Sequence, residues 1–366
     1  MAIVSTLPAC GRKESTPPAD GGPADAQTVS VNSAVNRLAV SNDALYTIIG
    51  DELVRFRPSD RRAETVGYLS KLTGAPAEGS MLFQSDGRLW LLWTAHRDGG
   101  ASGEVQLAPL NAAAGALEEP NYTLPGWPDA AAFYGEQFFF SRVTDQTDGQ
   151  AALHKLDIAS GEIQIVNSNS VFEIVSGQTD ILYAPIKMKP LPNGQPGMFV
   201  PDAEAHSVIC SYDAAQGRET PTTVGVDFPV FAEVGEQYAT VHESDGKKEN
   251  YELRLRDQTG QTQKTFPFAN AFSWPVLLSD GQHLVLMTQN RTGAAVTVLD
   301  QALNVLGVWQ LAEGKETELL AMDAAYVYVS QKDLPASGAP DPEQPVSIDR
   351  IEYLRKDAAP EAIFAR

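Results

Sequence analysis

The sequence has little cysteine, few histidines and no long apolar run. Only Cys10 and Cys210 occur among 366 residues, which excludes the disulfide framework that holds many small secreted domains together. Cys210 stands in the strand-like run SVICSY and is expected to be a small buried apolar residue. No stretch approaches the roughly 18 apolar residues that cross a bilayer, so we expect no membrane-spanning helix.

Basic residues are scarce too. Lys and Arg together number 27 against 47 Asp and Glu, and the formal net charge is −20. Proteins that bind nucleic acid or anionic lipid need a net basic footprint. The composition therefore argues against both partners, and we expect a soluble, monomeric domain.

Motifs of catalysis and of cofactor binding are absent as well. The sequence contains no G-x-S-x-G elbow, phosphate-binding loop, dinucleotide fingerprint, H-E-x-x-H pair or paired C-x-x-C. We therefore expect no cofactor, no metal and no catalytic residue. The five histidines are scattered, and only His96 and His242 lie at matching positions of the repeats described next, which leaves a metal or acid–base site there as an open hypothesis.

The chain does contain a recurring pattern. A turn of small residues precedes a short burst of aromatic and β-branched residues, and an alternating strand follows after a polar loop. The bursts are ALYTII from Ala44, RLWLLW from Arg88, QFFFSR from Gln137, ILYAPI from Ile181, QYATVH from Gln237, HLVLMT from His283 and AYVYVS from Ala325. A period of about 40 to 50 residues with four strand-like stretches is typical of a propeller blade. We predict an all-β fold, a seven-bladed β-propeller of four-stranded antiparallel blades.

The predicted propeller covers residues 28–366. Its blades are expected at about 28–70, 71–124, 125–168, 169–224, 225–268, 269–314 and 315–366. Two ways of closing the ring stay open: residues 28–31 can add a strand to the last blade, or residues 361–366 can complete it unaided.

The residues before the propeller resemble a lipoprotein leader. Leu7, Pro8, Ala9 and Cys10 resemble the lipobox of bacterial lipoproteins, whose cysteine carries the lipid. Residues 1–9 would be the remnant of a signal peptide, and residues 10–27, rich in Pro, Gly, Ala and Asp, a disordered tether. The alternative is a disordered cytoplasmic N-terminus with an incidental cysteine, and whether a full signal peptide lies upstream of Met1 stays open.

With this leader and these repeats, the chain resembles bacterial lipoproteins that carry a divergent propeller of the tryptophan-aspartate-repeat or TolB-like kind. The resemblance covers residues 28–366 by pattern only. It implies a lipid anchor at Cys10 as the sole membrane attachment, a location outside the cytoplasm, and non-covalent recognition of a protein or glycan in the cell envelope. A secreted or periplasmic soluble protein is the alternative.

The longer loops, expected between the second and third strands of the blades, gather on one side of a propeller, and long loops on a rigid scaffold usually carry binding. A proline-rich loop at 187–205 is the longest of them. Basic residues recur near the ends of the bursts and could attract an anionic ligand, or they could simply pair with neighbouring acids such as Asp333. These candidate ligand-binding residues are Arg97, Arg142, Lys187, His242, Arg291 and Lys332.

Aromatic residues followed by proline form a second regularity. Trp127 and Trp274 each precede a proline, as does Phe228, just before the first strand of a blade. Such rings could stack on a sugar at the mouth of the channel, or wedge between neighbouring blades. We expect a non-catalytic binding or scaffold module. A polysaccharide lyase or glycosidase that uses Arg142, Arg291 and His242 is the alternative, because fold alone does not decide function.

Overall fold

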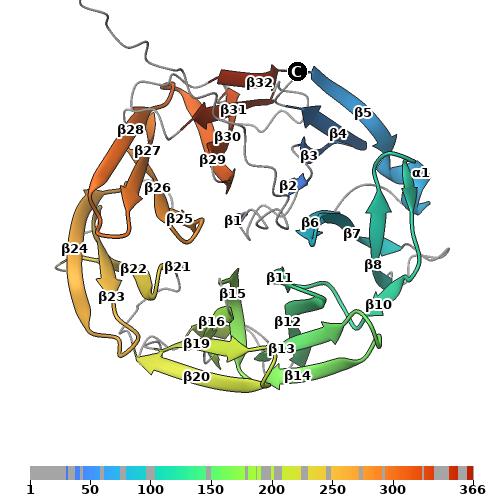
Figure 1. Ribbon diagram of the computed structural model, residues 1–366, viewed down its shortest axis with the longest axis horizontal. Helices are drawn as coiled ribbons and strands as arrows, with labels where there is room; N and C mark the ends of the chain where they lie inside the picture. The colour runs from blue at the N-terminus through green and yellow to red at the C-terminus, as the bar shows by residue number, and fades with distance from the viewer. Residues whose placement is uncertain are drawn as a thin grey trace, which may run out of the picture.

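Among the residues that the structure describes, strands predominate, and the one helix is the short α1 (Leu69–Thr73). In the computed structural model the strands form blades around a central axis (Figure 1), which confirms the prediction of an all-β propeller. The residues that the structure describes are 30–31, 38–41, 44–57, 62–74, 80–95, 104–145, 150–177, 180–186, 188–190, 199–201, 208–223, 230–244, 249–271, 275–290, 293–323, 325–333, 346–352 and 361–365.

Six blades of the described chain are antiparallel meanders of four strands in sequence order, each from one continuous part of the chain. The first strand of each lies nearest the axis (Figure 1). Blade 1 comprises β2 (Leu38–Ser41), β3 (Ala44–Ile49), β4 (Glu52–Arg57) and β5 (Arg62–Tyr68); blade 2 comprises β6 (Met81–Ser85), β7 (Arg88–Ala95), β8 (Glu104–Asn111) and β10 (Tyr122–Leu124), with β9 (Ala116–Leu117) also paired to β8; blade 3 comprises β11 (Ala131–Tyr134), β12 (Gln137–Asp145), β13 (Gln150–Asp157) and β14 (Ile163–Asn167); blade 4 comprises β15 (Ser170–Ser176), β16 (Ile181–Ile186), β19 (Val208–Asp213) and β20 (Arg218–Thr223); blade 5 comprises β21 (Phe231–Val234), β22 (Gln237–Glu243), β23 (Asn250–Arg256) and β24 (Thr262–Ala269); blade 6 comprises β25 (Val276–Ser279), β26 (His283–Asn290), β27 (Gly293–Asp300) and β28 (Val305–Gln310).

The remaining sheet of the ring, which we call the closing sheet, differs from these six. It has five strands in the order β1 (Ser30–Val31), β29 (Lys315–Met322), β30 (Tyr326–Asp333), β31 (Val346–Glu352) and β32 (Glu361–Ala365). The prediction of seven four-stranded blades is therefore wrong: the described chain has six blades, and the closing sheet combines both ends of the described chain. The two expected ways of closing the ring are not alternatives: β1 pairs with β29 on the axial side, and β32 pairs with β31 on the outer side.

The core consists of layers between neighbouring blades, since successive side chains of a strand point to opposite faces of the sheet. In β22, Val241 packs with Leu286 of blade 6. Tyr238, on the other face, packs with Leu182 of blade 4. Second strands such as β22 are thus buried on both faces, which explains why the bursts are apolar at nearly every position rather than at alternate ones.

The turns after the third strands of five blades share one device. A side-chain oxygen accepts a hydrogen bond from a backbone N–H two or three residues further on, the Asx turn that Asp and Asn favour. The donor-to-acceptor distances are 2.8 to 3.0 Å, from Ala114 to Asn111, Ser160 to Asp157, Ala215 to Asp213, Thr259 to Asp257 and Ala302 to Asp300. These short turns all lie on one side of the ring, here called the turn face.

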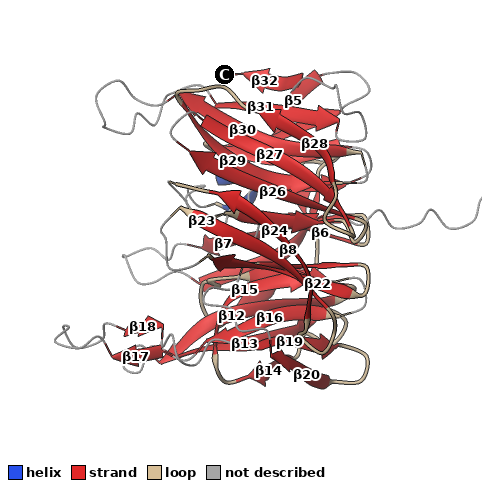
Figure 2. Ribbon diagram, turned by 90° about the vertical axis from the view of Figure 1, so that its left-hand side faces the viewer, coloured by secondary structure: helices blue, strands red, loops and turns tan. Residues whose placement is uncertain are grey.

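The opposite side, where the second strand of each blade meets the third, is here called the loop face. Between β16 and β19 the chain forms an additional hairpin, β17 (Met188–Pro190) and β18 (Phe199–Pro201), with Lys189 opposite Val200. This hairpin projects from the body of the propeller (Figure 2). In the described chain, the hairpin forms a sheet of its own rather than an extension of blade 4.

Candidate functional site

Four of the candidate residues predicted from the sequence lie in the described part of the chain: Trp127, Arg142, His242 and Lys332. Three of them stand near the end of a second strand, where the strand reaches the loop face: Arg142 in β12, His242 in β22 and Lys332 in β30. The others, Arg97, Lys187, Arg291, Trp274 and the lipidation candidate Cys10, together with His96 and Phe228, lie outside the described residues.

Arg142 lies against Gly126, the residue before Trp127, in the connection that leads from blade 2 to blade 3. The half-buried ring of Trp127 packs against the core layer that contains Trp90 and Phe140. The Nε and Cζ atoms of Arg142 lie 3.3 and 3.6 Å from the position that a Cβ on Gly126 would occupy. The guanidinium therefore packs closely on the backbone beside Trp127, a contact that the absence of a side chain at Gly126 allows.

His242 lies in the interior, with only 4% of its surface exposed. It shares a face of β22 with Tyr238 and Thr240, the face that packs toward blade 4. Its Nε2 atom lies 2.9 Å from the Thr240 hydroxyl and 3.3 Å from Nη2 of Arg256. The side chain of His242 is therefore buried against blade 4, and its role in ligand binding stays a prediction.

The contacts of Arg256 define the protonation of His242. Arg256 donates from Nε to the Thr240 hydroxyl (3.2 Å) and from Nη1 to the Gly260 carbonyl (2.7 Å). Since Arg256 can only donate, Nε2 of His242 must accept from its Nη2, and the imidazole is then neutral with its proton on Nδ1. Burial, with the charges of Arg254 and Arg256, lowers the pKa of His242 to about 4. This imidazole is poorly placed to abstract a proton from a glycan.

Lys332 stands at the end of β30 in the closing sheet, half-buried and opposite Glu316 of β29. The neighbouring Asp333 forms an ion pair with Lys315, with 3.1 Å between Nζ and Oδ1. Charges of both signs therefore alternate at this part of the loop face. The exposed Glu316 and Glu318 of β29 add negative charge near the basic group.

Glu173 is a candidate that the sequence analysis missed. It lies in β15, the strand of blade 4 nearest the axis, where the pairing register with β16 shifts between Val171 and Ile174. A bulge of this kind re-aims side chains. Burial raises the pKa of the half-buried Glu173 to about 8. The irregular register depends on pairing in three dimensions, and no periodicity in the run VFEIV of β15 predicts it.

The described residues contain no group of three or more His, Cys, Asp or Glu side chains placed to hold a metal ion. Cys210 is buried, and burial together with Glu219 raises the pKa of its thiol to about 12. A thiol of such high pKa is a packing group rather than a nucleophile. Within the same residues, no helix has the length and apolar character to cross a membrane.

The fold and this loop face define a β-propeller with four-stranded antiparallel blades and a side that bears longer connections. No family model matches the sequence, and no curated protein does. A quinonprotein alcohol dehydrogenase-like protein from Bacteroides thetaiotaomicron is similar in structure, with a TM-score of 0.53 and 9% identity, over 87% of this chain and 74% of that one.

Two further solved structures are similar. PorZ of Porphyromonas gingivalis, described as an essential bacterial surface component of the type-IX secretion system, has a TM-score of 0.50 and 10% identity over 92% of this chain, which spans only 39% of PorZ. TolB from Acinetobacter baumannii has a TM-score of 0.42 and 13% identity, over 76% of this chain and 62% of TolB. At these identities, the similarity to the dehydrogenase-like protein and to PorZ shows the propeller fold.

Proposed function

We propose that this protein is a non-catalytic binding module of the bacterial cell envelope, located outside the cytoplasm and held there through Cys10. Its loop face would recognise an anionic glycan or an acidic protein segment. The propeller neighbours include PorZ, which is described as a bacterial surface component, and the lipobox-like LPAC run of the sequence supports the same location.

The projecting hairpin is the observation that carries this proposal. In the described chain, β17 and β18 form a separate two-stranded sheet, and an isolated hairpin is marginally stable at best in water. Blade 4 does not need it, because β16 pairs directly with β19 from Ile181 opposite Tyr212 to Tyr183 opposite Cys210. An insertion that the scaffold does not require is better explained by recognition than by folding.

Arg142 supplies the second element of the proposed surface. It lies on the loop face against the backbone of Gly126, the residue before the half-buried Trp127, and arginine and tryptophan are both enriched at binding hot spots. In a chain of net charge −20, a guanidinium on this face gives an anionic ligand a local attraction.

The test shortens the hairpin and measures binding separately from folding. Residues 187–207 would be replaced by a short Asp-Gly turn, which blade 4 should tolerate, and Arg142→Ala would be made alongside it. Binding of oligogalacturonate and of a polyglutamate peptide of matched charge would be measured by calorimetry. The exposed Arg218→Ala, on the outer strand β20, is the control.

We expect the shortened variant and Arg142→Ala each to bind one of these two probes at least about tenfold more weakly than the wild type. Arg218→Ala should bind as the wild type does, and all three variants should melt as cooperatively. If both probes bind the shortened variant with unchanged affinity, or if neither probe binds the wild type, the loop face is not the recognition surface for anions.

A further inference from the structure

The outer strands of the blades differ in how they protect their free edges. An unpaired strand edge offers N–H and C=O groups to any extended chain, and charged residues or proline on the edge strand usually prevent another chain from pairing there. Three outer strands carry such residues: Arg62 and Glu64 in β5, Arg218 and Pro221 in β20, and Lys264 and Pro267 in β24. The outer strand β28 reads VLGVWQ and carries neither.

Large apolar side chains are exposed on this same strand. Val305 and Val308 of β28 are 45% and 49% exposed. The strand nevertheless has a fixed position, since Trp309 is buried in the layer shared with the closing sheet and its ring lies against Gly307, where a Cβ would be 2.7 Å away. In the described chain, β28 pairs on its inner side with β27 and ends the order of its sheet.

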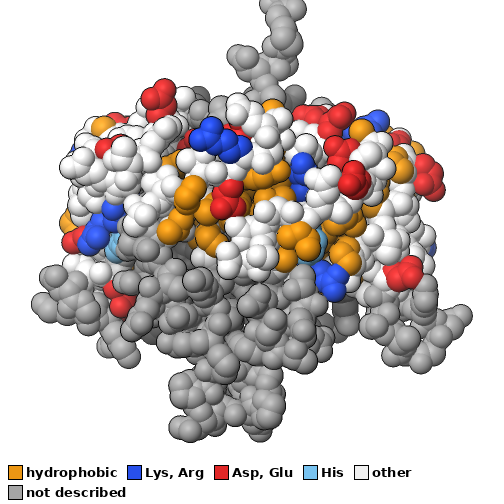
Figure 3. Space-filling model, turned by 90° about the horizontal axis from the view of Figure 1, so that it is seen from below, with side chains coloured by type: hydrophobic (Ala, Val, Ile, Leu, Met, Phe, Trp, Pro, Cys, Tyr) orange, Lys and Arg blue, Asp and Glu red, His pale blue; other side chains and the backbone are white. Residues whose placement is uncertain are grey.

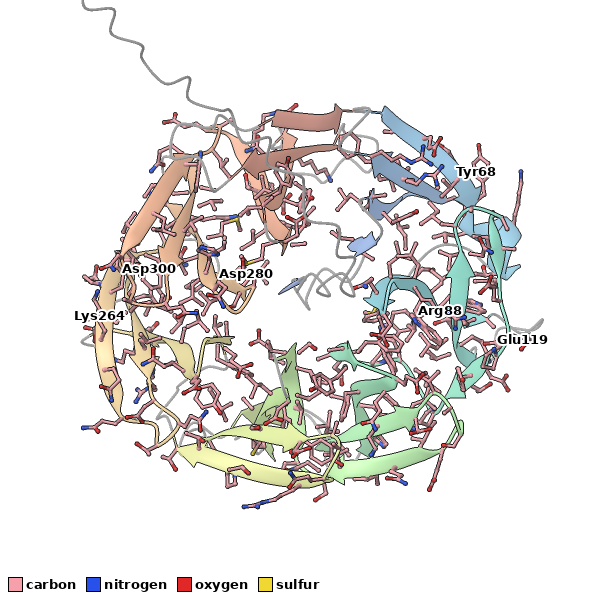
Figure 4. The ribbon with its side chains drawn as sticks, in the orientation of Figure 1. Tyr68, Arg88, Glu119, Lys264, Asp280 and Asp300 are labelled. Carbon is pink, nitrogen blue, oxygen red and sulfur yellow. The ribbon has the colours of Figure 1, made fainter. Side chains whose placement is uncertain are left out.

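The ends of β28 differ electrostatically. Before the strand, Lys264 of β24 donates to Asn304 Oδ1 (3.1 Å) and to the Ala302 carbonyl. Lys264 and Asp300 both lie on this outer side of the ring (Figure 4). After the strand, Glu313 is exposed. The charges are thus partly balanced before β28 and negative after it.

We propose that β28 accepts an extended segment of another protein as an added strand, with apolar residues against Val305 and Val308 and a basic residue near Glu313. The edge groups of a strand are complementary to an extended chain. A second copy of this protein is a poor occupant, because each copy carries a charge of −20 and like charges repel on association. This edge lies on the outer wall and is independent of the loop face.

The proposal does not include β14, although this strand also lacks charge and proline and exposes Ile165 by 62%. Apolar side chains lie among charged ones on the wall that Figure 3 shows, the side where β14 and β20 stand in Figure 1. The exposed Glu162 stands directly before β14, and β14 is one residue shorter than β28. The β14 edge serves below as an internal comparison.

The test uses a synthetic peptide in which valine and threonine alternate and a lysine stands at each end, and a second peptide with glutamate at each end. Fluorescence anisotropy with full-length protein gives the affinities, and hydrogen exchange shows which strand gains protection. Val308→Lys would block the edge, and Val308→Thr would keep a β-branched, uncharged residue at the same place. Thr265→Lys on the already charged β24 is the control.

We expect the lysine peptide to bind more tightly than the glutamate peptide and to slow exchange in residues 305–310. Val308→Lys should weaken binding at least about tenfold, and Val308→Thr and Thr265→Lys less than about threefold. Protection of β14 alone, equal binding by Val308→Lys, or no binding would overturn the proposal. So would light scattering that shows a dimer lost on Val308→Lys, since the occupant would then be a second copy.

Discussion

Because His242 is buried, we expect the propeller to lose stability in mild acid. A proton cannot bind Nε2 of His242 without displacing Nη2 of Arg256, 3.3 Å away, and without placing a second cation beside that guanidinium. The pKa is about 4 in the folded protein against the ordinary value of 6.5. Between these values the unfolded chain binds the proton and the native protein does not, so stability falls as the pH falls from about 6.5 to 4.

The size of this loss follows from the shift. Each pKa unit corresponds to about 1.4 kcal/mol, so the contribution of His242 comes to about 3 kcal/mol across that range. Below pH 4 both states are protonated and this contribution no longer changes. The assay is urea denaturation at intervals from pH 7.5 to 3.5, for the wild type and for His242→Gln, whose amide oxygen can still accept from Arg256 but cannot titrate.

His242→Gln should flatten the decline in unfolding free energy between pH 6.5 and 4 by about 3 kcal/mol relative to the wild type. Carboxylates titrate in both proteins, so their effect cancels in the difference. The control is His283→Gln, because His283 is partly exposed and pairs with Asp280 (3.1 Å) near the surface. Parallel curves for the wild type and His242→Gln would mean that His242 titrates alike in the native and unfolded states.

Three further predictions concern the scaffold. Gly260 has a φ of +86°, and a Cβ there would lie 1.9 Å from the Thr223 carbonyl oxygen. Gly260→Ala should therefore lower the free energy of unfolding clearly more than Gly135→Ala, because Gly135 has a φ of +54° in open space and its loss should stay near 1 kcal/mol. Equal losses by chemical denaturation would contradict the close approach of blades 4 and 5. Glu173→Gln should gain stability relative to the wild type as the pH rises from 5 to 9, because the raised pKa of about 8 makes the native protein hold a proton that the unfolded chain has released. The same pH profile of stability for the variant and the wild type would mean that the Glu173 carboxyl group is not desolvated. Deleting residues 361–366 should lower the melting temperature more than deleting residues 1–31, since β32 makes four pairings with β31 and β1 makes two with β29; the reverse order in calorimetry would mean that β1 is the more important closure.

Local patterns were enough to predict the strands, because period-2 alternation and turn chemistry act over a few residues. The burst ALYTII coincides with β3, and the aspartates of the turns, such as Asp257, were visible in the sequence. Contacts between blades were not predictable in this way. The burial of His242 depends on blade 4, and the contact of Arg142 with the backbone at Gly126 joins β12 to the connection that precedes β11. The register shift at Glu173 and the fifth strand of the closing sheet likewise arise from pairing in three dimensions.

Hydrogen exchange with and without bound oligogalacturonate shows whether the loop face is the recognition surface. We expect slower exchange at the loop-face ends of β12 and β30, where Arg142 and Lys332 stand, and in the hairpin of β17 and β18. The turns that follow Asp157, Asp257 and Asp300 on the turn face should exchange at an unchanged rate. Protection confined to those turns, with none in β12, β30 or the hairpin, would contradict recognition by the loop face.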